Sequence, residues 1–158
     1  MLYRPSTAVP FSTLELVWST LEGGGAATRR DYLDFVVDGR SLRDSLPPSG
    51  TISPLGWGFI EPMHIGQLLM REPPESPTGR VPLYVCDACG DLGCGAVTAR
   101  IKETTDAIVW SDFAWEVDYE AELGEDGIGR RYEGIGPFEF RKAAYWSVLN
   151  ERLAQVAV

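Results

Sequence analysis

The sequence predicts an α+β fold in one domain spanning all 158 residues, with a single antiparallel sheet of five or six strands. A C-terminal helix and one short helix are expected to pack on that sheet. Four segments alternate apolar and polar residues, the period of half-buried strands: residues 12–19, 31–38, 97–102 and 109–117. Apolar residues recur at helical spacing over residues 62–71 and 141–154. A chain of this length can bury a core without disulfides or metal.

The first two alternating segments are expected to pair as antiparallel strands. Leu14, Leu16 and Trp18 fall on one side of the first segment, and the second segment repeats the pattern. Between the two segments, residues 23–25 are consecutive glycines, which hold neither helix nor strand cheaply and predict a mobile loop. This loop lacks the Gly-Lys-Ser/Thr ending of a phosphate-binding loop, so a connection is favoured over a nucleotide site. An Asp-Gly pair at residues 38–39 predicts a turn after the second strand.

The last two alternating segments predict a hairpin around residues 103–107. Keeping the apolar side chains of both strands on one face requires Arg100 to lie opposite Trp110, and Thr98 opposite Asp112. In that register Trp110 points away from the core.

An acidic run begins on the second strand of this hairpin. Residues 112–126 carry seven acidic side chains and no Lys or Arg. Trp110, Asp112, Glu116 and Asp118 are therefore expected to form an outward-facing patch in which an aromatic anchor is surrounded by acids. Such a composition is typical of a protein-binding surface. A hairpin whose outer Trp is covered by another segment of the same chain is the structural alternative.

All three cysteines of the chain lie within nine residues, as Cys86, Cys89 and Cys94. The Cys-x2-Cys-Gly spacing is that of a zinc knuckle, whose tight turn directs two thiolates at one ion. Cys94 offers a third sulfur, and His64, the only histidine, could complete a tetrahedral Cys3His site. A structural zinc ion is therefore one hypothesis for this segment, although it holds only half of a double Cys-x2-Cys motif.

Two other interpretations of the cysteines stay open. They can be small, partly buried residues in a glycine-rich turn. They can also be a redox pair, although the helix that lowers a thiol pKa in thioredoxin-like sites is not predicted after the motif. Asp87 and Asp91 beside the sulfurs would further oppose thiolate formation. A Ser–His–Asp hydrolase and a zinc-dependent nucleoside deaminase are disfavoured, because neither motif occurs.

The second half of the chain resembles a group of small uncharacterised bacterial proteins. The shared features are the cysteine segment over residues 84–95, Val-Trp-Ser-Asp-Phe over residues 109–113, and Gly-Pro-Phe-Glu-Phe over residues 136–140 followed by Tyr145. Some members of this group are labelled oxidoreductases. The resemblance implies a shared fold and marks the cysteine segment, and it carries over no catalytic residue.

Charge and composition narrow the function further. Fourteen basic and 23 acidic side chains give a net charge of −9, which repels nucleic acids and suits a basic protein surface or a metal ion. An acidic surface that only keeps the protein in solution is the alternative. No signal peptide or membrane span is evident, and an odd number of cysteines does not form a secreted disulfide framework, so a cytoplasmic protein is expected.

The leading hypothesis is a non-enzymatic interaction protein that binds a basic protein partner through its acidic, Trp-bearing patch. The alternative is a thiol- or zinc-dependent oxidoreductase centred on Cys86, Cys89 and Cys94.

Overall fold

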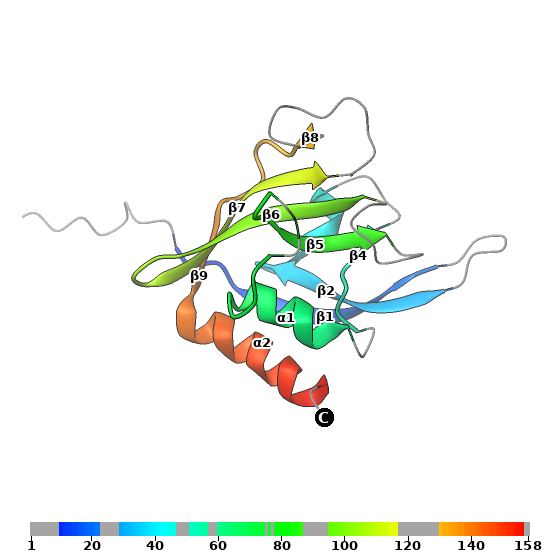
Figure 1. Ribbon diagram of the computed structural model, residues 1–158, viewed down its shortest axis with the longest axis horizontal. Coiled ribbons are helices and arrows are strands. Elements are labelled where there is room, and N and C mark those ends of the chain that lie inside the picture. The colour runs from blue at the N-terminus through cyan, green and yellow to red at the C-terminus, as the bar shows by residue number, and fades with distance from the viewer. Residues whose placement is uncertain are drawn as a thin grey trace, which may run out of the picture.

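The structure is a computed structural model that describes residues 10–22, 29–46, 51–56, 60–74, 76, 78–86, 95–116 and 130–156. The fold is α+β, with antiparallel sheets and a C-terminal helix (Figure 1). The strands are β1 (Leu14–Leu21), β2 (Arg30–Val37), β3 (Arg40–Ser41), β4 (Thr51–Ile52), β5 (Val81–Cys86), β6 (Ala96–Glu103), β7 (Ala107–Glu116), β8 (Arg130–Arg131) and β9 (Phe138–Arg141). The helices are η1, a 3-10 turn (Arg43–Ser45), α1 (Glu61–Leu68) and α2 (Lys142–Val156).

The described strands form two sheets, so the prediction of a single sheet is wrong. The small sheet has the order β1-β2-β3, and the large sheet has the order β4-β5-β6-β7-β8 with β9 also paired to β7. Both edges of β2 are occupied, because β1 takes one edge and β3 takes part of the other. Nearer its start, the same edge of β2 meets a loop: the Leu33 N–H donates to the Leu55 carbonyl at 2.9 Å. β2 therefore has no free edge at which a strand of the large sheet could pair with it.

The pairing of the first two strands is confirmed. β1 and β2 run antiparallel, with Trp18 opposite Leu33 and Leu14 opposite Val37. The predicted Asp-Gly turn connects β2 to β3, and both of its residues adopt positive φ, 52° at Asp38 and 80° at Gly39. The glycine loop at residues 23–25 lies outside the described residues.

One face of the large sheet is covered by the small sheet and by both helices, as Figure 1 shows. Phe35 of β2 lies edge-on to Trp110 of β7, with ring centroids 5.4 Å apart. Tyr145 and Leu149 of α2 are buried against the same cluster, which confirms the predicted apolar stripe of the C-terminal helix. In the described part of the chain, neither α1 nor α2 has the length and apolar composition that crossing a membrane requires.

The central hairpin of β6 and β7 is confirmed, but its predicted register is wrong. Ile101 lies opposite Trp110, and Arg100 lies opposite Ser111. A bulge then shifts the register, so that Thr98 lies opposite Ala114 rather than Asp112. The extra residue is on β7, where Asp112 has a φ of 55°. Since one inserted residue exchanges the two faces of a strand, the inward positions before and after the bulge have opposite parity.

Candidate functional site

Trp110 faces the core, and the prediction that it faces outward is wrong. The side chain is completely buried. Its indole N–H donates to the Tyr145 hydroxyl at 3.1 Å, and that hydroxyl donates to the Leu68 carbonyl at 2.6 Å. Phe140 lies edge-on to the indole at 5.2 Å between centroids. Trp110 therefore joins β7 to both helices and is not accessible to a partner.

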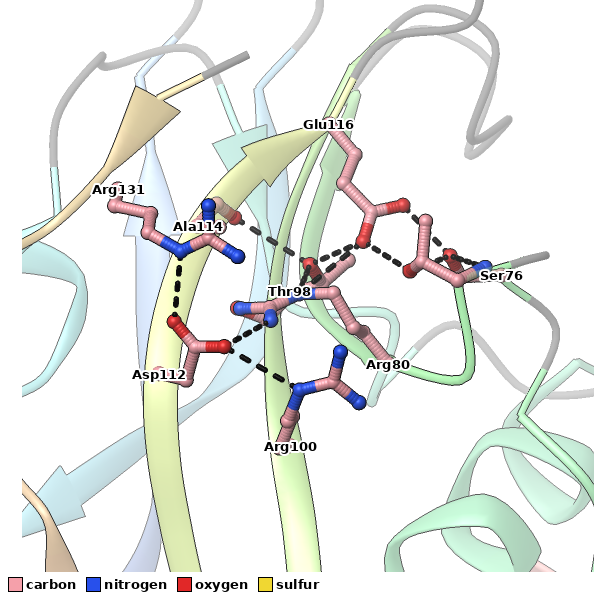
Figure 2. A network of polar contacts seen from close by, with 9 residues as sticks. Ser76, Arg80, Thr98, Arg100, Asp112, Ala114, Glu116 and Arg131 are labelled. Atoms are coloured by element: carbon pink, nitrogen blue, oxygen red, sulfur yellow. Dashed lines mark hydrogen bonds and ion pairs between the residues drawn. The ribbon is translucent and has the colours of Figure 1, made fainter. Parts of the chain in front are cut away.

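Asp112, expected in the acidic patch, is surrounded by arginines of its own chain (Figure 2). Its carboxylate accepts from Nη1 of Arg80 at 2.7 Å, from Nε of Arg131 at 3.1 Å and from Nε of Arg100 at 3.3 Å. Partial burial alone would raise the pKa of Asp112, but Arg80 and then Arg131 outweigh that effect and the pKa lies below its usual value. The carboxylate is charged and already paired.

Glu116, the second predicted acid, is nearly buried and equally well satisfied. It accepts hydrogen bonds from the hydroxyls of Ser76 at 2.6 Å, Thr78 at 2.6 Å and Thr98 at 2.8 Å. Nε of Arg80 lies 3.3 Å from the same carboxylate. Figure 2 shows how these contacts converge from β6, β7 and the segment before β5.

Arg80 is the residue that joins the two carboxylates, and its side chain is fully buried. Besides its ion pairs it donates from Nε to the Thr98 hydroxyl at 3.0 Å. The network therefore connects the segment that leads into β5 with β6 and β7, which is a structural role. It leaves neither Asp112 nor Glu116 available to a basic partner. Asp118, the fourth predicted patch residue, lies outside the described residues.

The predicted metal ligands are only partly described. Cys86 ends β5 as a free, partly exposed thiol, and Cys89 and Cys94 lie outside the described residues. His64 lies on α1 with 6% of its surface exposed, and its Nδ1 has no hydrogen-bond partner. Burial lowers the pKa of His64, and the nearby charge of Glu61 opposes this only in part. Within the described ranges no three His, Cys, Asp or Glu side chains form a metal-binding group, and the zinc and redox hypotheses stay predictions.

A groove of about 370 Å³ lies between β1 and α2, away from the predicted patch. Its lining from β1 and β2 consists of Leu14, Glu15, Leu16, Trp18 and Leu33; its lining from α2 consists of Val148, Glu151, Arg152 and Gln155. Alternate residues of β1 point toward α2, so the strand contributes mainly apolar side chains. The volume is in the range of sites that bind small molecules or a few side chains of a peptide.

Trp18 is the most exposed large apolar side chain among the described residues, at 56%. The Arg152 guanidinium lies 5.5 Å from the centroid of its ring, within the range of a cation–π contact. On another side the indole lies against Gly56, where a Cβ would come within 2.9 Å of the ring. The indole is thus exposed in the groove and held from two directions.

Arg152 is itself held in place by Glu61 of α1. Its Nε and Nη2 each donate to a carboxylate oxygen of Glu61, both at 2.8 Å. Glu61 is completely buried, so this bidentate pair neutralises the arginine. Glu15 and Glu151 on the groove rim are exposed, and neither makes an ion pair within the described ranges. The groove therefore combines an apolar floor with a negative rim.

Sequence reasoning placed Trp18 on the correct face of β1 but did not identify it as a surface residue. Alternation assigns a face to each side chain and carries no information on where α2 crosses the strand. The sequence offered no signal for the groove, since Glu15 on β1 and Glu151 on α2 are separated by most of the chain and line the same groove only in the fold.

Comparisons of the chain with protein-family models, with curated proteins and with solved structures find no match.

Proposed function

We propose that this chain is a non-enzymatic cytoplasmic interaction protein that binds a basic protein partner in the groove between β1 and α2. The observation that carries the proposal is the exposed indole of Trp18, held in an apolar groove with an acidic rim. The class of function is the one expected from the sequence. The binding face is a different one, because Trp110 is buried and Asp112 and Glu116 are paired internally.

The geometry of Trp18 supports a role as an anchor. Tryptophan is enriched among the few residues that dominate binding energy, because it buries a large area when a partner covers it. Contacts with Arg152 and Gly56 already restrict the indole in the free protein. An anchor that is ordered before binding loses little conformational entropy when the complex forms.

The charges around the groove support a basic partner. Glu15 and Glu151 place two exposed carboxylates on opposite sides of the apolar floor. The net charge of −9 adds a long-range field that attracts cationic segments and repels nucleic acids. Rim charges of this kind act mainly on the association rate and on the choice of partner.

The enzymatic alternative remains a prediction. A thiol- or zinc-dependent enzyme centred on Cys86, Cys89 and Cys94 would use a different part of the chain, since Cys86 does not line the groove. Measuring both zinc content and thiol reactivity of the purified protein tests that alternative separately.

Fluorescence anisotropy with two labelled peptides tests the proposed function. One is an eight-residue peptide that alternates Lys and Val, and the other replaces each Lys with Glu. We expect the Lys-Val peptide to bind and Trp18→Ala to weaken binding by at least about tenfold.

The double change Glu15→Gln, Glu151→Gln should weaken binding of the Lys-Val peptide by a factor of about two to ten, as for partly exposed ion pairs. Trp146→Ala is the matched control, because Trp146 is a partly exposed tryptophan outside the groove lining. Equal binding of the two peptides, or unchanged binding by the Trp18→Ala protein, would overturn the proposal.

A further inference from the structure

The direction of the backbone N–H and C=O groups shows which residues of β1 face its free edge, the edge that does not pair with β2. The Asp38 N–H donates to the Thr13 carbonyl at 3.0 Å, so Thr13 turns its backbone toward β2. The Ser12 N–H donates in the opposite direction, to the Glu139 carbonyl at 2.7 Å. Because these directions alternate along an antiparallel strand, the outward-facing N–H and C=O groups of β1 belong to its even-numbered residues: Leu14, Leu16, Trp18 and Thr20.

Strand β9 begins to pair with this edge and then stops. Ser12 and Phe140 form an isolated parallel bridge, after which the chain enters α2 at Lys142. In the described part of the chain, no strand continues the pairing along β1 beyond that bridge. The edge from Leu14 onward therefore borders the groove with unpaired backbone groups, and three of the four residues that supply them also line the groove.

Because the free edge and the groove share these residues, we infer that the partner binds as an extended strand added along the free edge of β1, forming a fourth strand of the small sheet beside α2. The inference rests on the proposed function and specifies how the basic partner is recognised. Main-chain hydrogen bonds to an exposed sheet edge provide affinity, and pockets for alternate side chains provide specificity.

The side chains of such a strand would meet two different surfaces. Alternate residues on one face would cover Leu14, Leu16 and Trp18, which requires apolar side chains. The intervening residues would lie on the face of β1 that carries Glu15, which suits Lys or Arg. The occupant is thus a segment of about seven residues in which basic and apolar residues alternate, long enough to span the free edge.

A second copy of this chain is a less suitable occupant. Edge strands of identical chains often pair, but here each copy carries a net charge of −9. Charge complementarity favours the basic segment.

Backbone methylation of the Lys-Val peptide tests strand addition. One analogue carries N-methyl groups on every Val amide, and the other carries them on every Lys amide. Since only one edge of the peptide strand faces β1, only one analogue should lose its main-chain hydrogen bonds. We expect affinity to fall by at least about tenfold for one analogue and to change by less than about threefold for the other.

Each other outcome has a definite meaning. Equal affinity of both analogues, or equal loss from both, overturns strand addition, and the proposed function still stands if Trp18→Ala weakens binding. Failure of the unmodified peptide to bind overturns both. A stable dimer of the protein in sedimentation experiments, weakened by Trp18→Ala, identifies a second copy as the occupant and likewise overturns the inference.

Discussion

Arg80 is fully buried and lies 2.7 Å from Asp112, the residue at which β7 bulges. The bulge therefore does two things to the strand. It exchanges the faces of β7, which turns Trp110 into the core, and it brings an acid to a buried guanidinium. Asp112 and Glu116, which a sequence pattern groups into a binding patch, are instead part of the packing of the large sheet.

Removing Arg80 should strongly destabilise the protein. Arg80→Met leaves Asp112 and Glu116 without their shared cation, and breaking a buried ion pair from one side costs about 3–5 kcal/mol. Arg100→Met is the matched control: the Arg100 side chain is 54% exposed, so the same change there should cost less than about 1 kcal/mol. Urea denaturation measures both. Similar losses of unfolding free energy in the two variants would show that Arg80 does not form a buried cross-link between Asp112 and Glu116.

The hydroxyl of Tyr145 should contribute to stability through Trp110. In Tyr145→Phe the indole N–H and the Leu68 carbonyl both lose a buried partner, which costs about 1–3 kcal/mol. The double variant Trp110→Phe, Tyr145→Phe tests the coupling between the two side chains, because the Trp110→Phe change has already removed the indole donor. The free energies of unfolding should then be non-additive, by about 0.5 kcal/mol or more. Strict additivity would contradict a Trp110–Tyr145 hydrogen bond.

Stability should fall as the pH decreases through the range in which His64 titrates. Burial lowers the pKa of His64 in the folded state, so the unfolded chain binds the proton first. The stabilisation is complete above the ordinary pKa of about 6.5 and is lost as the pH falls toward the lower folded-state pKa. Urea denaturation at pH values from about 7.5 to 5.5 should show this slope in the natural protein and a flatter one in His64→Gln. Equal slopes would mean that His64 is not the titrating group.

Metal removal should leave the groove intact. Treatment with a chelator, followed by alkylation of the thiols, changes the region of Cys86, which does not line the groove. We expect the Lys-Val peptide to bind the treated protein with unchanged affinity. Circular dichroism checks that the treated protein retains its secondary structure. Loss of peptide binding by a treated protein that is still folded would show that binding depends on the cysteine segment and would contradict the groove.

Some elements of this fold follow directly from the sequence pattern. The alternation of β1 and β2 and the stripe of α2 depend on local periodicity, which the chain expresses clearly. The Asp-Gly turn at residues 38–39 depends on two adjacent residues that tolerate positive φ. The division into two sheets does not follow from it, because alternation identifies strands without identifying which edges meet. The contact of Leu33 with Leu55, which helps close the edge of β2, joins segments that share no pattern.

The position of Trp110 was beyond sequence reasoning for a specific reason. Asp112 adopts a positive φ within β7, which aspartate tolerates better than most residues, but no glycine marks the bulge. An unbroken strand places Trp110 outside, and the inserted residue places it inside. The arginines that neutralise Asp112 likewise come from outside the acidic run, at Arg80, Arg100 and Arg131, and only the fold brings them together.

Titration of the labelled protein with the Lys-Val peptide, followed by NMR of the tryptophan indole N–H signals, tests the central proposal most directly. Trp18→Phe and Trp110→Phe spectra assign the two signals. The proposed groove predicts a progressive shift of the Trp18 signal with the Trp110 signal unchanged, since one indole is 56% exposed and the other is buried. An unperturbed Trp18 signal at saturating peptide would contradict the binding site proposed here.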